Sequence, residues 1–388
     1  MLKDIIIYTP MYVTLFWAVV LLFSKHRNNK AKYFLGVFMI VAFFVYLSHA
    51  VYFKQHNDIF IYFDPLYTFA SLSVYPLYYW YIKLLTSEVK INYKNLKLLI
   101  PALFFSFALL ILYILMSPQE RINYIDRVLF NKPINELETI NIKTQKVIYL
   151  LGRLTFIIQI IVFMILGTKL VKRYNRRVAN FYSNLENRTI LWVKMLLISF
   201  IVTSLISIVF NIIGRAVFIN LTYLLVIPSV IFSGLLFIIG FQGYLQNYTV
   251  VDLVKDENTH PEIDLRDFNH QLLKEKLLKL FEDETIYRDS NLKMTQISVL
   301  LQTNRTYISN LINNDFSCSF SEFVNRYRVT DAKRILVDEQ FKNHSLTSIS
   351  EVAGFGSLAT FIRVFKEMEG VPPGKYRELY CKKVTAKN

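Results

Sequence analysis

The stretch that decides the fold runs from Ser348 to Lys366 and reads SISEVAGFGSLATFIRVFK. Apolar residues at helical spacing stand on both sides of the turn Gly354–Ser357, so the pattern predicts two short helices joined by a tight break. The first helix is expected to open at Ser348. The second is expected to bury its phenylalanines and to expose Arg363. Two helices in this order are typical of a helix-turn-helix unit.

A second unit of the same kind precedes this one along the chain. Thr295 is expected to cap one short helix, and Asn304 is expected to cap the helix that follows it. Between the two units, the stretch from Phe320 to Val337 has helical periodicity and predicts one long amphipathic helix, which would set the separation of the units. On that helix, Arg328 and Arg334 are expected to cap or brace the helix itself.

A further amphipathic stretch, Gln271–Glu284, is interpreted as the first helix of the same domain. A dimerising coiled coil is the alternative, but the stretch is shorter than the three or four heptads that such a coil needs. Cys318 and Cys381 are the only cysteines, and their spacing is not that of a metal site. No metal and no cofactor is therefore expected.

Several motifs within residues 292–377 stand in an order that is far more specific than one helix-turn-helix pattern. They are Tyr307–Asn313 (YISNLIN), Phe320–Val329 (FSEFVNRYRV) with Ala332–Leu336 (AKRIL), Gly354–Phe355 through Thr360–Phe361 to Phe365–Lys366, and Gly370–Pro373 with Tyr376–Arg377. This part of the chain resembles the AraC/XylS family of bacterial transcription regulators. The whole chain looks like the membrane-embedded members of that family.

The resemblance implies that two helices enter adjacent major grooves of double-stranded DNA, about 34 Å apart. By motif position it also implies which residues approach bases and which approach phosphates. They are Thr306, Ser309 and Asn310 in one groove, Leu358, Ala359, Thr360 and Arg363 in the next, and Arg305 and Lys366 at phosphates. Arg363 is expected to be the strongest base contact, because a guanidinium binds guanine through two hydrogen bonds.

The chain departs from the family at three small residues. Ser298 and Ser350 stand where Ala is usual in the first helix of each unit, and Ser317 stands where Gly is common before the long helix. Serine is small enough to fit at each of these positions, so the departures leave the expected fold unchanged.

The composition is too apolar for an ordinary soluble protein. Of the 388 residues, 54% are hydrophobic and 19% are charged, and the mean hydropathy is +0.34. The net charge of +15 is concentrated before residue 260: from His260 onward, 19 Lys and Arg stand against 17 Asp and Glu, a net of +2, which leaves +13 for the part before. The prediction of DNA binding therefore rests on the motifs and not on the overall charge.

Seven stretches are long and apolar enough to cross a bilayer, which takes roughly 20 residues. They are Ile5–Phe23, Tyr33–Phe53, Ile61–Leu85, Leu96–Met116, Val147–Leu170, Thr189–Ile213 and Leu221–Tyr244. The first, third and fifth connections are rich in Lys and Arg, whereas the second and sixth carry only Lys54 and Arg215. Because basic loops stay inside, the N-terminus is predicted outside and the C-terminal domain in the cytoplasm of a bacterial inner-membrane protein.

The fold class that these patterns predict is all-α. A seven-transmembrane-helix bundle, interpreted as a sensor, takes residues 1–245, and a polar linker takes residues 246–265. An AraC-type double helix-turn-helix domain takes residues 266–388.

Four polar residues of the membrane part are candidates for a ligand pocket. His49, Asp64, Arg153 and Asn211 map to the outer third of four different spans, and polar groups within spans tend to face the bundle interior. Asp64 and Arg153 are expected to pair in an outward-facing cavity for a small ligand. The alternative is that each residue lies at the interface and is hydrated among lipid headgroups.

The function predicted is that of a membrane-anchored one-component transcription regulator and not of an enzyme. Its expected partners are double-stranded DNA, the lipid bilayer and a small-molecule or envelope signal, and a homodimer is left open. The main alternative is a transporter or membrane enzyme with an appended regulatory or protein-binding helical domain. A third interpretation is that DNA binding serves only as a tether.

Overall fold

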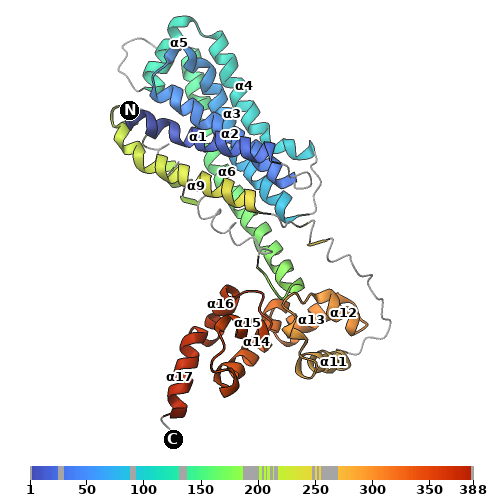
Figure 1. The fold of residues 1–388 in the computed structure, drawn as a ribbon. Helices are drawn as coiled ribbons and strands as arrows, with labels where there is room; N and C mark the ends of the chain where they lie inside the picture. Colours follow the sequence, from blue (N-terminus) through green and yellow to red (C-terminus); the bar gives the residue numbers. More distant parts are fainter. Residues whose placement is uncertain are drawn as a thin grey trace. The chain divides into compact units, whose positions relative to one another are not determined.

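The computed structural model of the chain describes residues 2–24, 30–87, 93–130, 138–186, 201–202, 205–206, 208–209, 213, 217–246, 250, 253–254 and 270–385. Within these residues the secondary structure is helical, apart from one isolated β-bridge between Tyr182 and Lys293, and the all-α expectation is confirmed for them (Figure 1). The chain divides into two compact units. Unit 1 is Met1–Val171 with Ile190–Val250, and unit 2 is Lys172–Thr189 with Val251–Asn388.

Unit 1 is a bundle of long helices joined by short helical turns. Its elements are α1 (Leu2–Phe23), α2 (Lys30–Phe53), α3 (Asn57–Thr86), η1 (Tyr93–Leu99), α4 (Ile100–Leu115), α5 (Pro118–Tyr124), η2 (Ile125–Leu129), the larger part of α6 (Ile140–Phe181), α8 (Val217–Asn220), η3 (Thr222–Leu225) and α9 (Val226–Leu245). Helix α1 packs against both α2 and α9. A Cβ at Gly240 of α9 would meet the ring of Trp17 of α1, so the absence of a side chain at Gly240 permits this close approach.

The expectation of seven spans is not confirmed. Five of the described helical segments are long and apolar enough to cross a membrane: Asp4–Phe23, Lys30–Phe53, Leu96–Leu115, Ile140–Phe181 and Tyr223–Leu245. The third expected span, Ile61–Leu85, lies in the 30-residue α3, which is not among these five; its many tyrosines, together with Asp64 and Lys83, lower its hydropathy. The sixth expected span lies mostly outside the described residues.

Helix α6 is much longer than the span predicted within it. The hydropathy pattern predicts Val147–Leu170, whereas the helix has 42 residues and ends at Phe181. The additional residues after Leu170 begin with the basic run Lys172–Arg177, KRYNRR. They were expected to form a loop between spans, but they continue the helix and belong to unit 2.

Unit 2 consists of short helices arranged around one longer helix. Its described elements beside the end of α6 are α11 (His270–Glu282), η4 (Ile286–Arg288), α12 (Met294–Leu300), α13 (Arg305–Asp315), α14 (Phe320–Val337), η5 (Glu339–Phe341), α15 (Leu346–Val352), α16 (Leu358–Glu369) and α17 (Pro373–Thr385). Helix α11 is confirmed as a packed helix of this domain, because its Phe281 is buried and lies 4.9 Å, ring to ring, from Phe323 of α14.

The helix ends of unit 2 confirm some predicted caps and correct others. Helix α14 has the predicted bounds, and Asn304 caps α13 by accepting a hydrogen bond from the backbone N–H of Thr306 at 2.8 Å. Thr295 is not a cap, because α12 already begins at Met294 and Thr295 is buried inside it. Ser348 does not open α15 either. Ser345 does, and its hydroxyl accepts from the N–H of Ser348 at 3.1 Å. Several nearby hydroxyls compete for each cap, so sequence alone does not select one.

Candidate nucleic-acid interface

The first helix-turn-helix unit is formed by α12 and α13. Ile297 of α12 and Ile308 and Ile312 of α13 are fully buried, and they hold the two helices together. The break between the helices passes through Gln302, whose φ of 49° lies in the left-handed region. The first turns of α13 include the exposed residues Thr306 and Asn310.

The expected DNA-contacting residues of α13 lie on this accessible face. Thr306 and Asn310 are exposed, and Arg305 is half-buried. Ser309 is also half-buried, and its hydroxyl accepts a hydrogen bond from the amide of Asn313 at 3.2 Å. The structure therefore brings these four residues to the first two turns of one helix.

The second helix-turn-helix unit is formed by α15 and α16. Gly354 begins the turn with a φ of +85°, and a Cβ there would stand 2.5 Å from the Cα of Arg288, so a glycine is required. Phe355, Phe361 and Phe365 are buried behind the turn. Ser357 caps α16 by accepting from the N–H of Thr360 at 3.2 Å.

The expected DNA-contacting residues of α16 are not equally accessible. Ala359, Arg363 and Lys366 are exposed, whereas Leu358 is half-buried because it packs against the hydrophobic core of this unit. Thr360 is half-buried as well. The guanidinium of Arg363 forms an ion pair with Glu367, one turn further along the helix, at 3.2 Å.

Helix α14 separates the two helix-turn-helix units and contains a buried arginine. Arg328 is 1% exposed, and its guanidinium donates to the carbonyls of Tyr287 and Asp289, each at 2.7 Å. Desolvation by burial lowers the pKa of Arg328 to about 10, so the side chain stays protonated at neutral pH. Arg334 donates to Asp331 at 2.9 Å. The prediction of a bracing role is confirmed for Arg328, whereas the side chain of Arg334 is 73% exposed and its role stays a prediction.

The three serines that depart from the family pattern fit in the way expected. Ser298 and Ser350 are buried, and their hydroxyls donate to the carbonyls of Thr295 at 2.8 Å and Thr347 at 2.7 Å. Ser317 adopts a φ of +50°, which is the backbone conformation that makes glycine common at such a position.

Residues 182–186 also lie at the candidate interface, although no motif in the sequence marks them. Glu186 accepts hydrogen bonds from the hydroxyls of Ser357 at 2.7 Å and Thr360 at 3.1 Å, at the start of α16. About 170 residues lie between the partners along the chain, so no local pattern predicts the contact. The segment that follows α6 therefore lies beside the first turn of α16.

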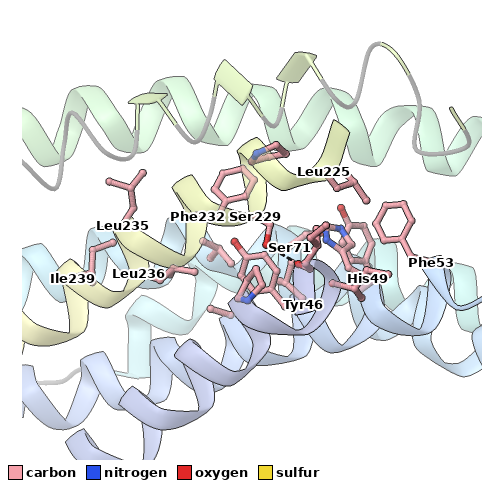
Figure 2. A pocket seen from close by; sticks show the side chains of 18 of the residues that line it. Tyr46, His49, Phe53, Ser71, Leu225, Ser229, Phe232, Leu235, Leu236 and Ile239 are labelled. Carbon is pink, nitrogen blue, oxygen red and sulfur yellow. Dashed lines mark hydrogen bonds between the residues drawn. The ribbon is translucent and has the colours of Figure 1, made fainter. Parts of the chain in front are cut away.

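Unit 1 holds a cavity of about 210 Å³ between α1, α2, α3 and α9. Figure 2 shows His49 and Tyr46 of α2 beside Ser71 of α3 and Ser229 and Phe232 of α9. Most of the lining is apolar, and the ring of His49 lies 5.0 Å from that of Tyr67. The cavity is an apolar space with several hydrogen-bonding groups at its wall.

The four residues expected to form a ligand pocket do not share one cavity. His49 lines the cavity of Figure 2, whereas Arg153 lines a smaller neighbouring pocket with its guanidinium 5.7 Å from the ring centre of Tyr149. Asp64 is buried and accepts a hydrogen bond from the hydroxyl of Tyr113 at 3.0 Å. Asn211 lies outside the described residues. A ligand site in unit 1 therefore remains a prediction, now centred on His49.

Comparison with known proteins identifies the C-terminal part. Residues 297–379 match the family described as "Helix-turn-helix domain", and the AraC-type resemblance is confirmed for that domain. Similar proteins include the HTH-type transcriptional regulators YtdP and YisR of Bacillus subtilis (strain 168), at 33% and 30% identity over 90 and 88 residues. The probable transcription factor PqrA of Proteus vulgaris is 28% identical over 102 residues.

These similarities are confined to one part of each protein. The match to YtdP covers 23% of this chain and 11% of YtdP, and the match to YisR covers 23% of this chain and 30% of YisR. The match to PqrA covers 26% of this chain and 80% of PqrA. No solved structure matches the chain significantly. The comparisons therefore concern the helix-turn-helix domain and leave unit 1 unassigned.

Proposed function

We propose that the chain is a membrane-anchored, one-component transcription regulator. Unit 2 binds double-stranded DNA, and unit 1 lies in the membrane and controls that binding. The matched domain and the relatives named as HTH-type transcriptional regulators support the first part. The proposal includes no enzymatic step.

The exposed side chains of α13 and α16 suit base reading. Asn310 offers an amide, which can bind adenine through two hydrogen bonds, and Arg363 offers a guanidinium, which can bind guanine in the same way. Arg363 pairs with Glu367 when DNA is absent, and both side chains are about half exposed. Such surface pairs contribute little free energy, so the guanidinium can exchange Glu367 for a base at small cost.

The exterior of unit 1 supports a place in the bilayer. Phe104 of α4, Ile158 of α6 and Ile227 of α9 are 64%, 60% and 69% exposed. Large apolar side chains on the outside of a bundle are unfavourable in water and are suited to lipid acyl chains. The basic run that follows the apolar part of α6 supports a cytoplasmic position for unit 2.

Control by unit 1 rests on one observation, the continuity of α6. Its 42 residues form one helix that supplies residues to both units. At 1.5 Å per residue the helix is about 63 Å long, roughly twice the hydrocarbon thickness of a bilayer. A change in unit 1 that shifts α6 therefore acts directly on residues that are packed inside the DNA-binding unit.

The cavity of Figure 2 supports a small apolar signal molecule. Its volume of about 210 Å³ is somewhat larger than a cavity of roughly 150 Å³ that holds benzene. The hydroxyl and imidazole groups of Tyr46, His49 and Ser71 line it and would orient one polar group of the ligand. We propose a single-ring or short acyl compound as the class of ligand.

The function is tested with a reporter fluorescent only in the cytoplasm, fused behind Asn388. We expect a fluorescent product that sediments with the membrane fraction and that shifts duplex DNA when reconstituted in lipid nanodiscs. A product that stays soluble, or reconstituted protein that shifts no duplex from a random-sequence pool at low salt, contradicts the proposal.

A further inference from the structure

Residues 182–186 directly follow α6, and we call them the tail of α6. Main-chain and side-chain contacts fix this tail within unit 2. Tyr182 forms the β-bridge with Lys293, and the N–H of Ser183 donates to the carbonyl of Leu292 at 3.1 Å. Tyr182 is fully buried, and the Lys293 ammonium lies over its ring at 5.9 Å. The tail is therefore a strand-like segment fixed at the start of α12.

A second group of contacts fixes the tail to α14. The hydroxyl of Ser321 donates to the carbonyl of Ser183 at 2.9 Å, and the guanidinium of Arg328 donates to the hydroxyl of Ser183 at 3.1 Å. Both partners are buried residues of the helix that separates the two helix-turn-helix units. Ser183 thus has a defined position relative to both α13 and α16, the two helices expected to contact DNA, which are called the reading helices below.

From Ser183 the chain runs onto the first turn of α16. Asn184 accepts from the N–H of Glu186 at 3.0 Å, which folds the segment into a turn, and its side chain lies where a Cβ on Gly356 would be. The carboxylate of Glu186 then accepts from the hydroxyls of Ser357 and Thr360. These residues are the N-cap and the third residue of α16, the helix expected to enter the second groove.

A carboxylate in this position competes with DNA for the same groups. The N-terminus of a helix attracts anions because of its free N–H groups and its dipole, and a DNA phosphate or base edge would approach the same turn. A hollow of about 340 Å³ is lined by Ser183 and Leu185, by Ser321 and Asn325 of α14, and by Thr360 and Arg363 of α16. Ala359 and Arg363 remain exposed, but DNA that approaches Ser357 and Thr360 must first displace the carboxylate of Glu186.

We propose that residues 184–186 are an autoinhibitory gate over the second helix-turn-helix unit, with the Glu186 carboxylate as its latch. The gate rests on the proposed function, because it presumes that α16 reads DNA. It is closed while the end of α6 holds Ser183 against α14, and it opens when α6 shifts. The contacts of Glu186 are with α16 and not with α13, so signal-dependent binding is a property of the second groove.

The latch is tested by Glu186→Gln and Glu186→Ala in the full chain in lipid nanodiscs. The probe is a duplex that the wild-type full chain selects from a random-sequence pool, and the readout is fluorescence anisotropy at fixed salt. The matched control is Glu339→Gln, which removes the same charge from an exposed residue of η5. We expect Glu186→Ala to bind roughly five- to tenfold more tightly, as for the loss of one partly exposed charged hydrogen bond, and the control to be unchanged.

The outcomes distinguish a failure of the proposed gate from a failure of the proposed function. If Glu186 only caps α16, its removal lowers the melting temperature and leaves affinity equal or weaker, which overturns the gate. If all variants bind equally, the gate is wrong and the proposed function stands. If neither wild type nor any variant binds a duplex, the proposed function fails and the gate fails with it.

A disulfide that holds residues 184–186 against the turn before α16 tests the gate in the opposite direction. The Cβ position of Gly356 lies 3.2 Å from the Cγ of Asn184, so Asn184→Cys with Gly356→Cys places two thiols within disulfide reach. We expect the oxidised double variant to bind the duplex roughly tenfold more weakly or worse, because the base contacts of one groove are lost, and a reductant to restore binding. The single variants are the controls for oxidation of the native cysteines. Equal affinity before and after reduction of a confirmed cross-link contradicts the gate.

Discussion

The two reading helices, α13 and α16, are built alike and differ in what covers their first turns. Each begins with a side-chain cap, Asn304 in one and Ser357 in the other. The second residues of the two helices, Thr306 and Ala359, are both exposed, and the third residues, Tyr307 and Thr360, are both half-buried. In α16, however, the hydroxyls of the cap Ser357 and of Thr360 donate to the carboxylate of Glu186. The two helices thus share their local architecture and differ in the carboxylate bound at the start of α16, which is the basis of the proposed gate.

The largest effect is expected from a substitution that unfolds the second helix-turn-helix unit, α15 with α16, and leaves the first one folded. Gly354→Val forces a β-branched residue into a φ of +85° and against the backbone of Arg288. We expect a loss of about 3 kcal/mol in the free energy of unfolding of unit 2, with α15 and α16 exchanging amide hydrogen faster and α12 and α13 protected. The measurement is hydrogen exchange resolved by residue.

Gly374→Ala is the control for this prediction. It lies in α17, where a Cβ would make only an ordinary contact of 3.6 Å with Leu346. We expect its stability to change by no more than about 0.5 kcal/mol. Equal loss of protection in all four helices after Gly354→Val would show that the two readers do not unfold separately.

The next largest effect distinguishes what the two readers recognise. Arg363→Ala removes the strongest base contact expected of α16, and we expect affinity to fall roughly 5- to 100-fold, with selectivity relaxed at one base pair. Asn310→Ala does the same for α13 in the other groove. Lys366 is an expected phosphate contact, so we expect Lys366→Ala to weaken binding to all duplexes alike and to reduce the slope of log affinity against log salt concentration by about one.

These variants are compared by footprinting at fixed salt on one selected duplex. Footprints and affinity unchanged by Arg363→Ala remove that residue from the base-reading set. If Arg363→Ala and Asn310→Ala affect the same base pair, the assignment of the two helices to separate grooves is wrong.

The smallest effect concerns how the two reading helices end. Ser317 after α13 and Gly370 after α16 both have left-handed backbones, with φ of 50° and 76°. Because only glycine adopts this conformation without strain, we expect Ser317→Gly to stabilise and Gly370→Ser to destabilise unit 2, each by about 1 kcal/mol. Chemical denaturation measures both, and the same sign for the two changes would contradict this reading of the turns.

The parts of the fold that follow from short-range patterns could be predicted from the sequence. The bounds of α14 follow from apolar periodicity after the cap Ser319, and the turn at Gly354 follows from a residue type that its φ demands. The extension of α6 could not be predicted in this way. Hydropathy marks where a helix is apolar and not where it ends, and KRYNRR suits a charged helix as well as a loop.

The candidate site was predictable only where a family motif covers it. The motif places Thr306, Asn310 and Arg363 on accessible helix faces, as the structure has them. Glu186 lies outside the motif, and its partners are distant along the chain, so tertiary packing alone brings them together. Depth within a span likewise did not indicate that Asp64 turns toward Tyr113 while His49 lines a cavity.

Genomic occupancy of the intact chain tests the central claim most directly. DNA is cross-linked in living cells and recovered from the membrane fraction through a tag behind Asn388, for the wild type and for Arg363→Ala. We predict discrete sites with two contacted grooves about one helical turn apart, and their weakening in the variant. Recovery of no discrete sites from the membrane fraction, or the same sites at the same occupancy in both proteins, would contradict the account.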